Sequence, residues 1–201
     1  MGGGDGGLLK NLLELKNTRP KEIIMVELDE LVLEACSKHL RTVCGPYLDL
    51  DRRVGENYTV LTEDALKFME LKIESNEEYD IIFGDLTDVP VETTETESLQ
   101  NNTNKFHSVS STTQETWKFI KRIHQLALSL LKPESGRFYI HCNGLSVPLI
   151  LKKYENLLSD LTITKNSILY SLQWTQTKSF VPSFMETWVF YQITLQKKVI
   201  K

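Results

Sequence analysis

The chain has 201 residues and a formal net charge of −4 at pH 7, with 41% hydrophobic and 25% charged residues. This length suits one domain with a buried core, and the charge balance excludes a basic surface for nucleic acid or an anionic membrane. No apolar run approaches the roughly 20 residues of a membrane span, and the N-terminal residues lack the features of a signal peptide. Cys36, Cys44 and Cys142 have neither zinc-site nor disulfide spacing, so we expect reduced thiols in a cytoplasmic protein.

Apolar strands alternate with amphipathic helices along most of the chain. The patterns predict helices over residues 8–17, 30–40, 65–73, 116–131 and 147–160, and strands over residues 22–29, 57–64, 79–85 and 136–142. Such alternation indicates an α/β fold with a mainly parallel sheet covered by helices on both faces. Two further strands, 161–173 and 185–195, follow with only a loop between them. They predict an antiparallel hairpin at the C-terminal edge of the sheet.

One segment interrupts this rhythm. Residues 91–114 are rich in Thr, Ser, Asn and Glu and poor in apolar side chains. A stretch of this composition cannot bury enough surface to hold itself rigid. We therefore expect a flexible insertion within a single domain that spans residues 1–201.

The first residues form a glycine-rich loop. Gly2, Gly4 and Gly7 satisfy the G-x-G-x-x-G pattern, and Glu27 follows about twenty residues on, as in dinucleotide-binding proteins. Asp5 argues against a pyrophosphate, because its carboxylate would lie close to two phosphate charges at a cost of roughly a few kcal/mol. A cationic ligand such as an S-adenosyl compound would reverse the sign of that interaction. The alternative is that Asp5 is a solvated residue of a surface turn.

Further acids follow the predicted strands. Asp29 is expected to cap the helix that follows it. Glu63 and Asp64 can either accept a hydrogen bond from an adenine amino group or cap a helix, and the sequence favours neither. Asp85 ends the strand 79–85, where open α/β folds form their ligand crevice, so a functional role is favoured there.

Several segments together resemble the catalytic domain of the aminopropyltransferases, and among these the spermine synthases. They are "GGGDGGLL", "MVELDE", "TEDALKF", "YDIIFGDLTDVPV", "TWKFI" and "VPSFMETWVFY". The resemblance implies a methyltransferase-like Rossmann fold in which decarboxylated S-adenosylmethionine, a co-substrate and not a bound cofactor, donates an aminopropyl group to spermidine. Methylthioadenosine is then released. A spermidine synthase, an S-adenosylmethionine methyltransferase and a non-catalytic remnant that binds a nucleoside or a partner remain alternatives.

The resemblance also implies roles for individual residues, with no metal among the ligands. The implied residues are Asp5 and Asp85 as catalytic acids, Gly4, Glu27, Glu63 and Asp64 at the nucleoside, and Asp88, Glu186 and Trp188 at the polyamine. Gly84, Asp88 and the long insertion depart from the spermine synthase pattern, and these departures affect the expected shape of the amine pocket.

The resemblance finally implies that the first strand of the sheet is missing. Met1 would replace the last residue of that strand, which lies in the middle of the sheet, and the N-terminal dimerisation domain would be absent. On this basis we expect a homodimer for a full-length protein but not for this chain. We also expect impaired independent folding, since an unpaired central position exposes backbone polar groups.

Overall fold

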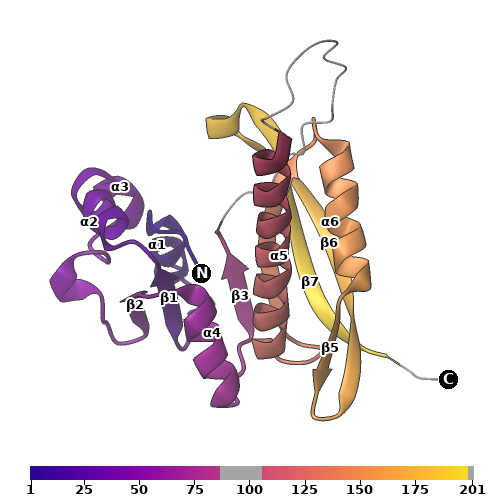
Figure 1. Ribbon diagram of the computed structural model, residues 1–201. Coiled ribbons are helices and arrows are strands. Elements are labelled where there is room, and N and C mark those ends of the chain that lie inside the picture. The colour runs from indigo at the N-terminus through magenta and orange to yellow at the C-terminus, as the bar shows by residue number, and fades with distance from the viewer. Residues whose placement is uncertain (87–105, 199–201) are drawn as a thin grey trace, which may run out of the picture. The chain divides into compact units, whose positions relative to one another are not determined.

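The computed structural model describes residues 1–86 and 106–198, and for residues 106–113 it describes the backbone only (Figure 1). The chain forms two compact units. The first is Met1–Ser75 with Gly84–Leu86, and the second contains Asn76–Phe83 and the described part of Thr87–Lys201. A single domain over residues 1–201 was predicted from the sequence.

The first unit contains a parallel strand pair with its helices. Its elements are α1 (Gly7–Leu13), β1 (Ile23–Glu27), α2 (Glu30–His39), α3 (Arg41–Cys44), the 3-10 turn Leu50–Arg52, β2 (Tyr58–Thr62) and α4 (Ala65–Glu74). β1 and β2 pair in parallel, with Ile23 opposite Tyr58 and Glu27 opposite Thr62. The carboxyl ends of both strands therefore lie at one edge, where Glu27 and the acids after β2 were predicted.

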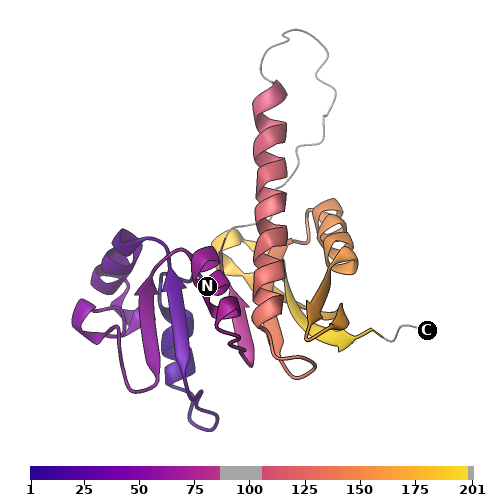
Figure 2. The ribbon, with the colours of Figure 1, turned by 60° about the horizontal axis from the view of Figure 1, so that its bottom comes forward.

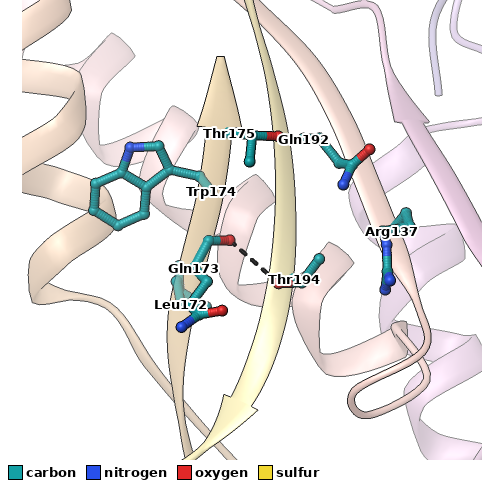
Figure 3. A pocket seen from close by; sticks show the side chains of 7 residues that line it. All are labelled: Arg137, Leu172, Gln173, Trp174, Thr175, Gln192 and Thr194. Carbon is teal, nitrogen blue, oxygen red and sulfur yellow. Dashed lines mark hydrogen bonds between the residues drawn. The ribbon is translucent and has the colours of Figure 1, made fainter.

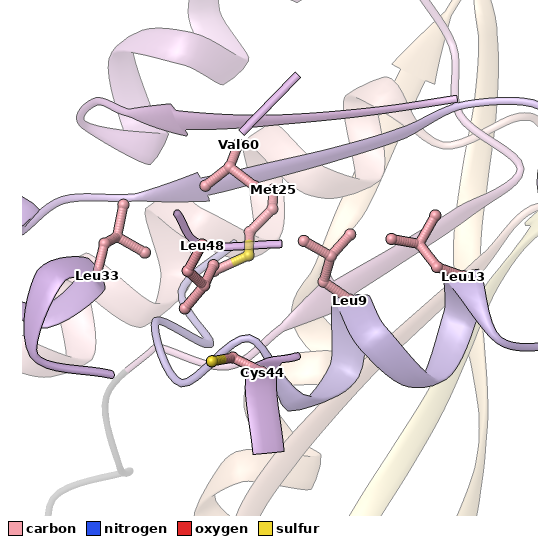
Figure 4. Packing of buried hydrophobic residues seen from close by; sticks show 7 residues of the cluster. All are labelled: Leu9, Leu13, Met25, Leu33, Cys44, Leu48 and Val60. Carbon is pink, nitrogen blue, oxygen red and sulfur yellow. The ribbon is translucent and has the colours of Figure 1, made fainter. Parts of the chain in front are cut away.

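The core of this unit forms where α1 packs on the strands. Leu9 and Leu13 are one helical turn apart on α1, and both are buried. They belong to one cluster with side chains from β1, α2, α3, β2 and the segment after α3 (Figure 4): Met25, Leu33, Cys44, Leu48 and Val60. Cys44 and Cys142 are buried, Cys36 is partly buried, and all three cysteines are free thiols, as expected from their spacing.

The backbone of Met1 and Gly2 lies between β1 and Asp85. The Gly2 amide donates to the carbonyl of Val26 at 2.9 Å, and the Asp85 amide donates to the carbonyl of Met1 at 2.9 Å. Gly2 and Asp85 form a parallel bridge. These two residues thus pair where the sequence analysis placed the end of the first strand, and the expectation of a longer strand before them stays a prediction.

The second unit contains a five-stranded sheet in the order β3-β4-β7-β6-β5. Its strands are β3 (Ile81–Gly84), β4 (Arg137–Gly144), β5 (Thr162–Lys165), β6 (Ile168–Val181) and β7 (Glu186–Lys197). Its helices are α5 (Phe106–Leu130), α6 (Pro148–Asp160) and the 3-10 turn Pro182–Phe184. Figure 2 shows α5 as the long helix of this unit. α6 contacts β4 and β6, and α5 contacts β5.

The predicted C-terminal antiparallel hairpin is confirmed, and it differs from the prediction in length and number of strands. β6 and β7 pair antiparallel from Tyr170 opposite Lys197 to Val181 opposite Glu186. The predicted strand 161–173 is in fact two strands, because Asn166 and Ser167 both adopt positive φ angles of 49° and 63° and turn the chain between β5 and β6. Two successive left-handed residues are the mark of a tight hairpin turn.

α5 begins earlier than predicted. The helix starts at Phe106, so residues 106–114 of the predicted flexible insertion are helical, and the rest of that insertion lies outside the described residues. Once a helix has formed, each added residue gains a backbone hydrogen bond, so it can extend into a stretch of modest propensity. Within the described ranges, no helix has the length and apolar character that crossing a membrane requires.

His124 lies in the core of the second unit, on α5. It is fully buried, its Nδ1 lies 2.7 Å from the carbonyl oxygen of Ile120, and its Nε2 lies 2.6 Å from the hydroxyl of Tyr154. Burial lowers the pKa of His124 to about 4, so the ring is neutral at pH 7. A neutral ring must donate from Nδ1 to the carbonyl and accept at Nε2 from Tyr154. His124 therefore packs in the core of the second unit.

Candidate functional site

The glycine loop before α1 is packed too closely for other residues. Gly2 has φ +71°, and a Cβ added there would lie 1.8 Å from the carbonyl oxygen of Asp85. A Cβ on Gly4 would lie 2.6 Å from Cγ1 of Val32 and 2.9 Å from Oε2 of Glu27. The loop therefore needs glycine at these positions, in one case because of backbone conformation and in both because of close approach.

Three predicted carboxylates lie along this loop. Glu27 is held at the end of β1, because its Oε1 accepts hydrogen bonds from the amides of Leu28 at 2.9 Å and Asp29 at 3.1 Å. The carboxylate of Asp85 reaches Gly3, where an added Cβ would lie 3.4 Å from its Oδ2. Asp5 Oδ1 accepts from the Gly7 amide at 2.8 Å. The structure thus brings Glu27, Asp85 and Asp5 to Gly4, Gly3 and Gly7 of one loop.

The partly buried thiol of Cys36 lies near the carboxylates of Asp5 and Glu27. Its pKa is raised mainly by burial, and further by the electrostatic influence of Asp5, Cys44 and Glu27. The carboxylates of Asp5 and Glu27 are therefore close enough to disfavour a further negative charge beside them. An anionic pyrophosphate would meet the same repulsion, whereas a cation would be attracted.

The acids after β1 and β2 also have structural roles. Asp29 Oδ1 accepts from the amide of Leu31 at 2.8 Å and caps α2, as the sequence analysis expected. Asp64 Oδ1 accepts from the amide of Leu66 at 2.8 Å and caps α4. A capping carboxylate keeps its second oxygen, so the cap does not exclude a contact with adenine. For Glu63, the backbone amide donates to the carbonyl of Glu27 at 2.9 Å, which ties the ends of β1 and β2 together.

Glu186 lies in the second unit, at the first residue of β7. Its Oε1 accepts from the amide of Ser146 at 2.6 Å. The pKa of Glu186 is lowered by hydrogen bonds from the Ser146 side chain and, to a lesser degree, from the Ser146 backbone. Its carboxyl group also lies against Gly144, where an added Cβ would be 2.1 Å from its Cδ. Sequence reasoning missed both Gly144 and Ser146, since neither belongs to a motif that includes Glu186.

Trp188 lies on the same strand face as Glu186 but is only 6% exposed. Phe184 stacks on it with ring centroids 4.2 Å apart, and His141 packs at 5.5 Å. Phe184 is 51% exposed, so it presents the aromatic surface of this group to solvent. Asp88, the third predicted polyamine residue, lies outside the described residues.

A separate hollow of about 550 Å³ lies on β4, β6 and β7. Polar side chains dominate its lining (Figure 3): Arg137, Gln173, Thr175, Gln192 and Thr194, with Leu172 and Trp174. The Trp174 ring points away from Gln192 and Arg137 in this view. None of the residues nominated from the sequence lines this hollow.

The described strands and helices form a methyltransferase-like α/β fold with a mixed sheet and a C-terminal antiparallel hairpin. A solved spermidine synthase in complex with the transition-state analogue AdoDATO aligns with 100% of this chain and 52% of its own, with a TM-score of 0.57. The sequence identity of that alignment is 17%, so it supports the fold alone.

The sequence comparisons are more specific than the fold. Residues 1–123 match the spermine/spermidine synthase domain, and the chain belongs to this family. A polyamine aminopropyltransferase of Clostridium botulinum (strain Eklund 17B / Type B) is 38% identical over 88 residues, which are 44% of this chain and 27% of that protein. One from Methanocaldococcus jannaschii is 31% identical over 88 residues, again 44% of this chain and 26% of the relative. The chain thus spans about a quarter of the length of these relatives.

Proposed function

We propose that the chain carries the catalytic part of an aminopropyltransferase that uses decarboxylated S-adenosylmethionine as donor and spermidine as acceptor. The observation that carries this proposal is the set of three carboxylates, Asp5, Glu27 and Asp85, along one glycine loop. The donor has a sulfonium and an ammonium group, and spermidine carries about three positive charges at pH 7 if its amines have lysine-like pKa values. Both substrates are therefore suited to an acidic loop.

Within this proposal each nominated residue has a distinct task. Glu27, fixed beside Gly4 by backbone amides, accepts hydrogen bonds from the ribose hydroxyls of the donor. Glu63 and the second oxygen of Asp64 are placed at the adenine. Glu186, with Trp188 and Asp88 in supporting roles, binds the ammonium groups of the polyamine.

The reaction forms one bond and breaks one. The acceptor nitrogen attacks the aminopropyl carbon next to sulfur, a C–N bond forms, and the electron pair of the C–S bond leaves with sulfur as neutral methylthioadenosine. The attacking amine must first lose a proton. Moving that proton from a group with a pKa near 10 to a carboxylate with a pKa near 4 costs ~8 kcal/mol at unperturbed values.

The carboxylate of Asp85 is the proposed general base that accepts this proton, and Asp5 is the second proposed catalytic carboxylate. A neighbouring sulfonium lowers the pKa of the attacking amine, and exclusion of water raises the pKa of a carboxylate, so closure around both substrates narrows the gap. Alignment of nitrogen, carbon and sulfur provides a further part of the rate acceleration through proximity.

The identity of the acceptor, spermidine or putrescine, distinguishes the proposed function from its nearest alternative, a spermidine synthase. The relatives named above are polyamine aminopropyltransferases, and the aligned solved structure is a spermidine synthase, which favours putrescine as a second candidate acceptor. The segments "DLTDVP" and "VPSFMETWVF" favour spermidine because they resemble the spermine synthases. A remnant that binds a nucleoside without transfer is the third candidate.

The test supplies the purified protein with decarboxylated S-adenosylmethionine and either putrescine or spermidine, and measures methylthioadenosine together with the polyamine product. We expect spermine from spermidine and little product from putrescine. Product from putrescine alone would refute the spermidine assignment. Binding of methylthioadenosine without transfer to either acceptor would identify a remnant, and methyl transfer from S-adenosylmethionine would identify a methyltransferase.

A further inference from the structure

The turn after β4 encloses the carboxylate of Glu186. β4 ends with a register irregularity between His141 and Gly144, and Gly144 then pairs with Trp188 of β7. The next amide, that of Leu145, donates to the carbonyl of Thr187 at 3.0 Å. These two backbone contacts hold the turn after β4 against the beginning of β7, and so they keep the turn close to Glu186. A bulge of this kind re-aims the residues that follow it.

Ser146 orients the carboxylate of Glu186 through hydrogen bonds. Its amide donates to Oε1 at 2.6 Å, and its side chain also forms a hydrogen bond that lowers the pKa of Glu186. Ser146 lies two residues before Pro148, the first residue of α6. The N-terminal end of a helix carries partial positive charge, which favours an anion beside it. The carboxylate is therefore kept ionised and oriented in the ligand-free protein.

Gly144 provides the space for that carboxylate. A Cβ at this position would lie 2.1 Å from Cδ and 2.1 Å from Oε2 of Glu186. Glycine is not required here by backbone conformation, because the φ of Gly144 lies outside the left-handed region that glycine favours. Glycine is required here because it leaves room for the Glu186 carboxylate, which is the far end of a flexible side chain.

From these contacts we propose that Gly144 and Ser146 are positioning residues, which hold the Glu186 carboxylate at the place where it binds an ammonium group of the polyamine. The inference rests on the proposed function, since it takes the polyamine role of Glu186 from there. It adds that the affinity for the polyamine depends on the β4–α6 turn, in which Gly144 and Ser146 form the seat of the Glu186 carboxylate. Neither Gly144 nor Ser146 is proposed to touch the substrate.

Gly144→Ala tests the seat without changing any charge. The added methyl group must displace the Glu186 carboxylate, whereas the backbone can keep its conformation. We expect the dissociation constant for spermidine, measured by calorimetry with methylthioadenosine present, to rise about tenfold or more, as for the loss of a charge-assisted hydrogen bond. The melting temperature should stay close to that of the parent. Ser146→Ala, which keeps the amide but loses the hydroxyl, should give a smaller increase and raise the pKa of Glu186 in a carbonyl-detected NMR titration.

Rescue by a shorter acid separates positioning from a general structural role. Glu186→Asp withdraws the carboxylate by one methylene, so Gly144→Ala should weaken spermidine binding much less in that background than in the parent. Leu145→Ala, a change in the same turn, is the matched control and should leave binding unchanged.

Two outcomes overturn the inference in different ways. If Glu186→Gln weakens spermidine binding but Gly144→Ala does not, the seat is irrelevant and only the positioning role is lost. If Glu186→Gln leaves spermidine binding unchanged, the polyamine role of Glu186 is refuted together with its seat. Because these experiments measure binding and a pKa, failure of aminopropyl transfer itself would be seen separately, in the turnover assay.

Discussion

Acidification should destabilise the protein through one buried side chain, His124. In the folded protein burial lowers its pKa to about 4, whereas an unfolded histidine has a pKa of about 6.5. The unfolded chain therefore binds more protons between these values, and the folded state loses stability as the pH falls through this window. At about 1.4 kcal/mol for each pKa unit, the loss should be about 2 kcal/mol between pH 7.5 and pH 5, and about 3 kcal/mol at its limit.

The hydrogen bonds of His124 explain why protonation of its ring is unfavourable in the folded protein. Nδ1 already donates to the carbonyl of Ile120, and Nε2 accepts from Tyr154. A proton on Nε2 would turn this acceptor into a second donor facing the Tyr154 hydroxyl, inside a core where the charge has no water.

The assay is urea unfolding at several pH values, followed by tryptophan fluorescence, in the parent and in His124→Asn. The asparagine amide can still donate to the Ile120 carbonyl but does not titrate. In the variant, the free energy of unfolding should therefore change between pH 7.5 and pH 5 by about 2 kcal/mol less than in the parent. An NMR titration of the imidazole nitrogens in the parent measures the pKa of His124 directly. A value near 6.5 in the folded protein, or the same pH dependence in the variant, would refute the reasoning.

Other substitutions test the loop, the chemistry and the core. Gly4→Ala should weaken binding of methylthioadenosine tenfold or more in calorimetry, because the new Cβ would lie 2.9 Å from Oε2 of Glu27; unchanged binding would remove Glu27 from the ribose site. Asp85→Asn should lower turnover by about 10²-fold or more while methylthioadenosine still binds, and equal turnover would exclude Asp85 as the general base. Leu33→Ala, at a fully buried site, should lower the free energy of unfolding by about 2–5 kcal/mol, whereas a change below 1 kcal/mol would contradict the described packing.

Periodicity in the sequence predicted most elements because it reflects burial directly. Leu9 and Leu13 of α1 and Met25 and Val26 of β1 are buried, as the apolar pattern indicates. The turn at Asn166 and Ser167 was missed, although Lys165, Asn166 and Ser167 interrupt the apolar pattern with polar residues that are typical of turns. The start of α5 at Phe106 was missed because composition describes only the average tendency of a segment. It does not show that a helix formed by the following residues extends into that segment.

The candidate site was predictable to the extent that its residues are close in the sequence. Gly4 belongs to a recognisable loop and Glu27 to the strand that follows it, so a pattern could link them before the structure showed that Oε2 of Glu27 lies against Gly4. Gly144 bears the same relation to Glu186, but β-strand pairing brings these two together across a long stretch of chain, and no spacing rule connects them. In both places a glycine leaves room for a carboxylate, and backbone amides, of Leu28 and Ser146 among others, fix its orientation. A carboxylate held this way needs little reorganisation when its ligand arrives. Substitution of Gly4 should therefore weaken binding of the ribose at Glu27, and substitution of Gly144 should weaken binding of an ammonium group at Glu186, even though the acid itself remains.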